Sequence, residues 1–187
     1  MIAAHIKSNE STKPYIAKLF CETNSDAIWV LGKPFGVQEL CKSLNIESSG
    51  GFIKPRDANK FAYIDESLGN ALGTSIGIGL ANPDKSIICF ISDAQLYMGS
   101  TLEAIFAMQR LKINNILLVI DYNKLGSRNP IPDFNFKVFG NMPVYWISPH
   151  PKSEPWKPAP NPNELGCSCV WVIKSHLIPE VHKFFNR

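Results

Sequence analysis

Two continuous apolar runs on either side of a helical pattern constrain this fold more than any other feature of the chain. The runs cover residues 86–91 and 116–120. Between them, residues 100–111 carry apolar side chains at helical spacing, and we expect one buried helix face made of Leu102, Ile105, Phe106 and Met108. Because both runs are continuous rather than alternating, they predict parallel strands that are buried on both faces. The stretch therefore predicts a right-handed strand–helix–strand unit within an α/β domain that has a mainly parallel sheet flanked by helices.

Polar residues follow both runs at the point where each predicted strand ends. The first run leads into Ser92, Asp93 and Ala94, and Asn123 follows Asp93 by thirty residues, just after the second run. Ligands of such sheets bind beyond the carboxyl ends of the strands, so Asp93 and Asn123 are expected to lie together there. A carboxylate and an amide oxygen suit Mg²⁺, which completes its octahedron with water and ligand phosphate. The alternative is that both side chains only cap a helix and a turn.

Residues 66–127 resemble the thiamine diphosphate motif and look most like the N-terminal, diphosphate-binding half of transketolases. The shared features are Ser67-Leu68-Gly69-Asn70, Asp93, Gly99-Ser100, Glu103-Ala104 and Asn123 within DYNK. The resemblance implies the three-layer thiamine diphosphate-binding fold. It also implies an Mg²⁺ ion held by Asp93, Asn123 and the Leu125 carbonyl group, with thiamine diphosphate bound to the ion.

Further cofactor contacts follow from the same resemblance. Ser92 and Ala94 flank the metal-binding Asp93, and Leu68 falls in the wall around the pyrimidine end of the cofactor. Lys33 stands where transketolases have a histidine that reaches the diphosphate; an ordinary solvated loop lysine is the alternative.

Several positions depart from the family pattern, including Glu66, which stands where the family usually has glycine. Ser92 and Ala94 replace the two glycines around the metal-binding aspartate, and Met98 stands where transketolases have a glutamate that links the two active sites of the dimer. Alanine fits this turn if the backbone does not require a positive φ. Methionine carries no proton, so the link between active sites is not expected here.

Length and composition indicate one globular domain. The chain has 187 residues, of which 45% are hydrophobic and 19% charged, and a net charge of +3 without a basic block. These values give no argument for nucleic-acid binding. We expect a cytoplasmic protein, because no apolar run approaches the length of a membrane span and residues 1–13 lack the apolar segment of a signal peptide. Nine of the fourteen prolines lie between Pro130 and Pro162, which predicts a loop region near residues 128–165.

The remaining elements are expected from shorter patterns. Strands are predicted over residues 26–31, 144–147 and 169–174, and helices over residues 37–44, 67–81 and 179–185, with a further short helix beginning near Ser11. The helix over residues 67–81 is rich in glycine, which costs about 1 kcal/mol per residue relative to alanine. We expect close backbone approach to compensate, either to the sheet, to a partner helix or to the cofactor.

Three hypotheses about function remain. The family places the glutamate that activates the cofactor in a pyrimidine-binding domain, which we do not find in this sequence. The first hypothesis is therefore one subunit of a split transketolase-like enzyme that acts on sugars, working in a homo- or hetero-oligomer with a separate pyrimidine-binding-domain chain. The second is half of a thiamine-dependent 2-oxo acid decarboxylase or synthase. The third is a degenerate, non-catalytic relative with a structural or regulatory role.

Overall fold

The computed structural model describes residues 27–32, 51–53, 61–65, 68–122, 124, 131–147 and 162–174. The predicted helices over residues 37–44 and 179–185, and the one near Ser11, lie outside these residues. The strands are β1 (Ile28–Gly32), β2 (Gly51–Ile53), β3 (Phe61–Asp65), β4 (Ile87–Ser92), β5 (Ile116–Tyr122), β6 (Val144–Ile147) and β7 (Cys169–Lys174). The helices are α3 (Ala71–Ala81), η1 (Asp93–Tyr97), α4 (Thr101–Arg110), η2 (Phe136–Phe139) and α5 (Pro162–Leu165).

The strands form one seven-stranded sheet in the order β2-β3-β1-β4-β5-β7-β6. All neighbouring pairs are parallel except β2 with β3. The two apolar runs are adjacent as predicted, with Ile87 opposite Ile116. The fold is therefore α/β with a mainly parallel sheet, and the fold class expected from the sequence is confirmed.

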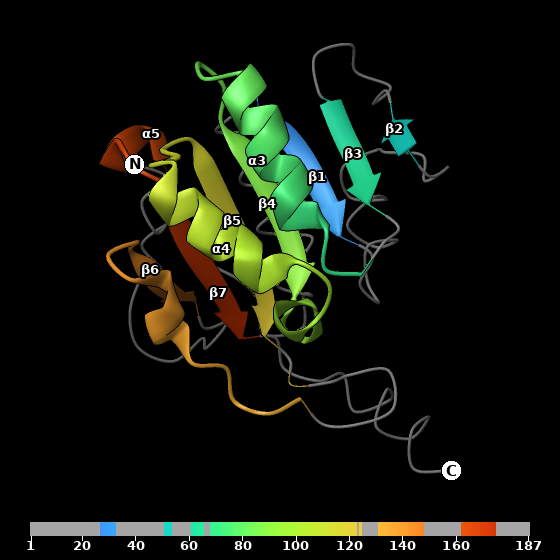
Figure 1. Ribbon diagram of the computed structural model, residues 1–187, viewed down its shortest axis with the longest axis vertical. Helices are drawn as coiled ribbons and strands as arrows, with labels where there is room; N and C mark the ends of the chain where they lie inside the picture. Colours follow the sequence, from blue (N-terminus) through green and yellow to red (C-terminus); the bar gives the residue numbers. More distant parts are fainter. Residues whose placement is uncertain are drawn as a thin grey trace, which may run out of the picture.

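The chain reverses its direction across the sheet between β1 and β4. From β1 it moves to β3 on one side, then crosses back through α3 to β4 and continues through α4 to β5. Both crossovers run the same way along the sheet, so their right-handedness places α3 and α4 on the same face (Figure 1). In open parallel sheets, ligands bind at such a reversal, beyond the carboxyl ends of the strands.

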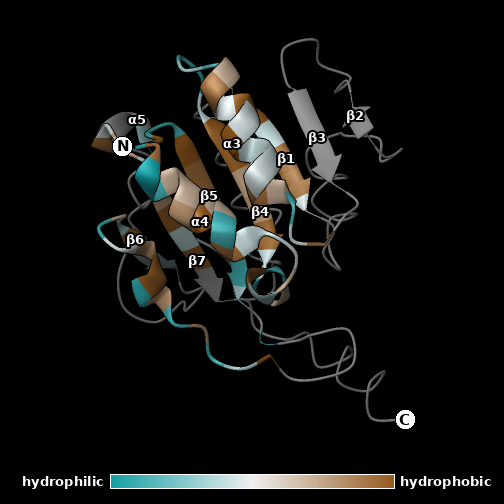
Figure 2. Cartoon of the chain, viewed as in Figure 1, coloured by the Kyte–Doolittle hydropathy of each residue, from teal (hydrophilic) through white to brown (hydrophobic). Residues whose placement is uncertain are grey.

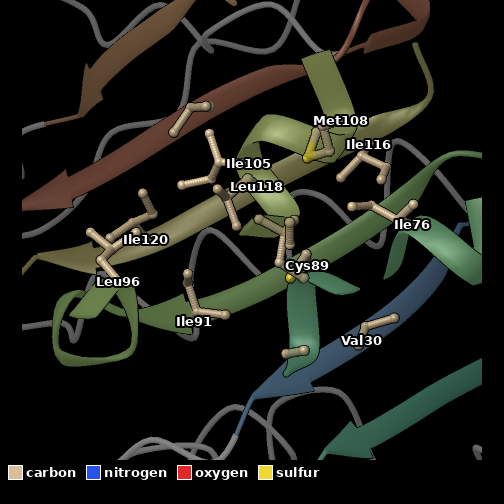
Figure 3. Close-up of a cluster of buried hydrophobic side chains, with 14 of the residues drawn as sticks. Val30, Ile76, Cys89, Ile91, Leu96, Ile105, Met108, Ile116, Leu118 and Ile120 are labelled. Carbon is tan, nitrogen blue, oxygen red and sulfur yellow. The ribbon is translucent and has the colours of Figure 1, made fainter. Parts of the chain in front are cut away.

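The hydrophobic core lies between the sheet and these two helices. Figure 3 shows side chains of β1, β4 and β5 interleaved with those of α3 and α4, among them Val30, Ile76, Cys89, Ile105 and Leu118. The alternate strand residues, such as Trp29, Phe90 and Trp171, are also buried, at no more than 4% exposure. The central strands are therefore covered on both faces, as continuous apolar runs predict, and Figure 2 shows their hydrophobic character.

Helix α4 corrects one expectation. Its buried residues are Thr101, Ala104, Ile105 and Met108. Leu102 and Phe106 point outward, with 39% and 55% of their surface exposed. The buried face is thus rotated relative to the one predicted, because the small residues Thr101 and Ala104, rather than the larger apolar ones, allow the helix to approach the core closely.

Helix α3 begins at Ala71, later than the predicted residue 67. Residues 68–70 form a turn in which Gly69 has φ +86°. At its other end, the buried Asn115 side chain donates through Nδ2 to the carbonyl groups of Gly79, Asn82 and Lys85, at 3.0–3.2 Å. Asn115 therefore fixes the end of α3 against the start of β4 and β5.

Candidate functional site

Strands β4 and β5 end side by side at the carboxyl edge of the sheet. Ser92, the last residue of β4, is opposite Asp121 in β5, and both side chains are buried. Asp93 begins η1 directly after β4 and is fully buried. The register therefore places Asp93 beside the turn that leaves β5.

The Asp93 carboxylate joins these two strand ends through backbone hydrogen bonds. Its Oδ1 accepts the Ala94 N–H at 2.8 Å, and its Oδ2 accepts the Lys124 N–H at 2.5 Å. A buried carboxylate is costly without such donors, and two N–H groups favour its ionised form. Lys124 has φ +59°, so the chain after β5 turns sharply toward Asp93. Asn123 and Leu125, its neighbours in the chain, lie outside the described residues, as does Lys33.

Ser92 and Gln95 form a capping box around the start of η1. The Ser92 backbone N–H donates to Gln95 Oε1 at 3.2 Å, and the Ser92 side chain accepts the Gln95 backbone N–H. This pair holds Asp93 and Ala94 in a compact turn. Gln95 was not predicted as a site residue from the sequence, although serine followed three residues later by glutamine is the signature of a capping box.

The Gln95 side chain also reaches the end of β1. A Cβ atom on Gly32 would lie 2.5 Å from Gln95 Oε1 and 2.9 Å from its Nε2, so a side chain at position 32 would collide with the amide. Gln95 is fully buried, and its Nε2 has no hydrogen-bond partner in the part of the chain that the structure describes. A buried amide donor therefore lies without an acceptor between the ends of β1 and β4.

The structure accommodates Ala94. Among the described non-glycine residues, positive φ occurs at Lys112 and Lys124, and Ala94 is not one of them. Its methyl group therefore causes no backbone strain in the turn. Met98 lies at the end of η1 with extended backbone, and 39% of its surface is exposed.

Leu68 lies in the turn before α3 and is half-exposed. This turn crosses the Met98–Gly99 backbone so closely that a Cβ on Gly69 would lie 1.9 Å from the Met98 carbonyl oxygen. Thr101 Oγ1 donates to the Gly69 carbonyl group at 2.9 Å and fixes the crossing. The starts of α3 and α4 are thereby held together at the edge of the sheet that carries Asp93.

An exposed network lies beside this turn. The Tyr122 hydroxyl group donates to Asp133 Oδ1 at 2.9 Å, and Lys124 Nζ forms an ion pair with the same carboxylate. The bond from Lys124, followed by that from Tyr122, holds the pKa of Asp133 below its ordinary value. Burial and the Asp133 bond raise the pKa of Tyr122. The network connects the segment after residue 130 to β5, and it was not predicted from the sequence.

The polar groups at this site suit a hard cation bound at the diphosphate end of a cofactor. The buried Asp93 carboxylate supplies anionic oxygen, and the polar groups around it are backbone N–H groups and an amide. Among the described residues there is no cluster of three His, Cys, Asp or Glu side chains that would hold a metal ion by itself. The Asp93 carboxylate is compatible with the Asp–Asn–carbonyl ligand set expected from the resemblance, in which the other two ligands are neutral.

Comparisons with known proteins bear on this segment. Residues 50–128 match the family described as thiamine pyrophosphate enzyme, C-terminal TPP binding domain. The comparisons support the thiamine pyrophosphate enzyme family. Thiamine diphosphate is the cofactor that this family supports. The expected resemblance to the N-terminal half of transketolases is not supported, because the matched domain is described as C-terminal.

Curated relatives match over part of their length. A 1-deoxy-D-xylulose-5-phosphate synthase of Fusobacterium nucleatum is 32% identical over 74 residues, which are 40% of this chain and 12% of that protein. Human transketolase is 28% identical over 114 residues, 57% of this chain and 18% of that enzyme. A putative transketolase family protein of Sinorhizobium fredii is 33% identical over 79 residues, 40% of this chain and 28% of that one. The chain therefore spans about a tenth to a quarter of these relatives' lengths.

A solved structure has a similar fold. It is a 2-oxoglutarate:ferredoxin oxidoreductase from Magnetococcus marinus, with a TM-score of 0.51 and 13% sequence identity, covering 93% of this chain and 66% of that one. At this identity the likeness concerns the fold. Within the described residues, no helix is long and apolar enough to cross a membrane.

Proposed function

We propose that this chain is the diphosphate-binding subunit of a split, transketolase-like enzyme that transfers a two-carbon ketol unit between sugars. The observation that carries the proposal is the buried Asp93 carboxylate at the end of β4, which accepts the Lys124 N–H from the turn after β5. These two turns hold the aspartate and the asparagine of the thiamine diphosphate motif. The matched family supports the same cofactor.

Asp93, the Asn123 side chain and the Leu125 carbonyl group would hold Mg²⁺. One anionic ligand and two neutral ones leave the ion enough positive charge and enough open positions to bind a diphosphate. The Lys124 N–H fixes one Asp93 oxygen in place, so the carboxylate is oriented before the ion binds.

The cofactor-binding role falls to Lys33, Leu68, Ser92 and Ala94 in addition to the metal ligands. Ala94 and Ser92 belong to the turn that the capping box holds rigid. Bound thiamine diphosphate would supply the electron sink that the transfer of a ketol or acyl unit requires. The residues of this chain bind and orient its diphosphate end.

The proposal assigns the pyrimidine end of the cofactor, and the glutamate that contacts it, to a separate pyrimidine-binding-domain chain. The active unit would then be a homo- or hetero-oligomer. Leu102 and Phe106 on the outer side of α4 provide exposed apolar surface, which commonly marks contact with another protein.

Co-expression with a candidate pyrimidine-binding chain tests this function. We expect ketol transfer between sugar phosphates by the complex and no turnover by the chain alone. Asp93→Asn should abolish turnover without dissociating the complex, whereas Asp84→Asn, which changes an exposed turn at the opposite edge of the sheet, should leave turnover unchanged. Full turnover by the chain alone, or by the Asp93→Asn complex, would contradict the proposal.

A second candidate is a thiamine-dependent synthase that acts on a 2-oxo acid. The match to the 1-deoxy-D-xylulose-5-phosphate synthase, 32% identical over 74 residues, supports it. The same complex distinguishes the two when it is supplied with a 2-oxo acid in place of the ketose donor: release of carbon dioxide would favour the synthase. A stable complex with neither activity would favour a non-catalytic relative.

A further inference from the structure

The Gln95 amide has a fixed orientation. The Ser92 backbone N–H needs an acceptor, so the amide oxygen faces Ser92 and the amide nitrogen faces the opposite way. The backbone N–H of Gln95 is used as well, since it donates to the Ser92 side chain. The Nε2 group is therefore the one polar group of Gln95 that remains available as a donor.

This donor lies at the reversal point of the sheet. It is 2.9 Å from the place where a Gly32 Cβ would be, at the end of β1, while Gln95 itself follows β4. β1 and β4 are the neighbouring strands between which the chain changes direction, the usual ligand position in such folds. The start of α3 is at the same edge and has no side-chain cap on its N–H groups.

The Gln95 amide nitrogen is buried without an acceptor in the described part of the chain, which indicates that a bound ligand supplies the acceptor at this place. Gln95 is 0% exposed, and its Nε2 makes no hydrogen bond among the described residues. Buried donors in folded proteins are almost always satisfied, because leaving one unpaired costs free energy. The capping box uses only the amide oxygen of Gln95, so it does not explain why the amide nitrogen is buried.

We propose that Gln95 Nε2 donates a hydrogen bond to a phosphate oxygen of the diphosphate group whose metal ion Asp93 holds. The inference rests on the proposed cofactor and adds a diphosphate-binding side chain to it. A diphosphate oxygen is anionic, so the bond is charge-assisted and stronger than one between neutral groups. Gly32 has no side chain and thereby leaves the space in which the amide lies between β1 and β4.

The test measures binding rather than turnover. Thiamine diphosphate and inorganic pyrophosphate are titrated calorimetrically, with Mg²⁺, into the purified chain and into its complex with the pyrimidine-binding chain. Gln95→Met keeps the length and most of the volume of the side chain but removes the donor, together with the acceptor of the Ser92 N–H. Gln109→Met is the matched control, because Gln109 Nε2 is already satisfied by the Val138 carbonyl group at 2.7 Å, near the opposite edge of the sheet.

We expect Gln95→Met to weaken binding of both ligands by about tenfold or more, the usual effect of losing a bond to a charged group. Gln109→Met should leave both affinities unchanged and lower only the melting temperature. If Gln95→Met does not fold, Gln95→Glu, which keeps an acceptor for the Ser92 N–H, replaces it and should weaken binding at least as much.

Two contrary results have different meanings. Equal affinity in the parent and in either folded Gln95 variant would overturn this inference and leave the metal assignment standing. Absence of thiamine diphosphate binding by the parent, both as the chain and as the complex, would overturn the proposed function together with the inference.

Discussion

Replacement of Gly69 by alanine should destabilise the chain strongly. The new methyl group would lie 1.9 Å from the Met98 carbonyl oxygen and 2.4 Å from its carbon, both backbone atoms that no rotamer change can move away. Gly69 also has φ +86°, a conformation that alanine adopts at a cost. The crossing of the two turns before α3 and α4 must open for the methyl group to fit.

The expected magnitude combines two contributions. Alanine in a left-handed conformation costs about 1–2 kcal/mol, and forced overpacking adds about 1–3 kcal/mol. We therefore expect a loss of roughly 2–5 kcal/mol in the free energy of unfolding, a large share of the 5–15 kcal/mol that is typical of a domain.

Gly77→Ala is the matched control within the same segment. Gly77 lies in the middle of α3, and a Cβ there would meet no atom within 4 Å. Alanine should raise the stability by about 0.5–1 kcal/mol, because it restricts the unfolded chain and favours the helix.

Urea denaturation of the two variants and the parent measures these differences directly. A Gly69→Ala chain as stable as the parent would refute the close crossing of the two turns. A destabilising Gly77→Ala change would show that α3 packs against something on its outer side, and normal stability with loss of assembly would assign that side to a partner.

Three smaller changes probe other parts of the account. Asn115→Ala should lower the free energy of unfolding by about 1–3 kcal/mol, because the buried Gly79 carbonyl group and the part-buried carbonyl groups of Asn82 and Lys85 lose their donor; thermal melting measures this loss, and an unchanged melting temperature contradicts it. Ser168→Ala should have a similar cost, since Ser168 Oγ accepts the Ile116 N–H at 3.0 Å and donates to the Ile113 carbonyl group at 2.8 Å; urea denaturation measures this loss, and an unaltered midpoint argues against it. The pKa of Tyr122 is raised above its ordinary value of 10.0, so its contribution to stability is complete below pH 10 and is lost as the pH rises through the raised pKa. Tyr122→Phe should therefore be less stable than the parent at pH 8, with a gap that narrows above pH 10, and a constant gap in denaturation curves across this range would contradict the assignment.

The sequence predicted the central strands well because burial on both faces leaves a continuous apolar run. β7 has the expected bounds, whereas β4 and β5 extend one and two residues beyond the expected ends at 91 and 120; β4 and β5 are neighbours as expected. The order of β7 and β6 was not predictable, because β7 inserts between β5 and β6 without a local pattern that encodes it.

Helix boundaries and faces were less predictable from local patterns. The positive φ of Gly69 delays the start of α3, and this conformation depends on contact with Met98, a residue distant in sequence. In α4, Leu102 and Phe106 fit the helical spacing of a core face yet point outward, because small residues face the sheet. Tertiary packing, rather than the local sequence pattern, determined both the start of α3 and the buried face of α4.

The site was predicted in part. Asp93 could be found because it ends an apolar run in a motif with fixed spacing, and the structure places it against the Lys124 N–H. Gln95 carried only the weak signal of a capping box, and its meeting with Gly32 joins elements that are far apart in the chain. The metal- or cofactor-binding roles stay predictions for all of the selected residues: Lys33, Leu68, Ser92, Asp93, Ala94, Asn123 and Leu125.

Calorimetric titration of thiamine diphosphate into the chain and its assembled complex shows whether Asp93 holds the metal ion of a bound cofactor. We expect saturable binding that requires Mg²⁺, is absent with thiamine lacking the diphosphate, and weakens at least about tenfold in Asp93→Asn because a negative charge facing a divalent ion is removed. Asp84→Asn should bind like the parent. Binding that persists after the metal is chelated, or that is unchanged in Asp93→Asn, would contradict the account.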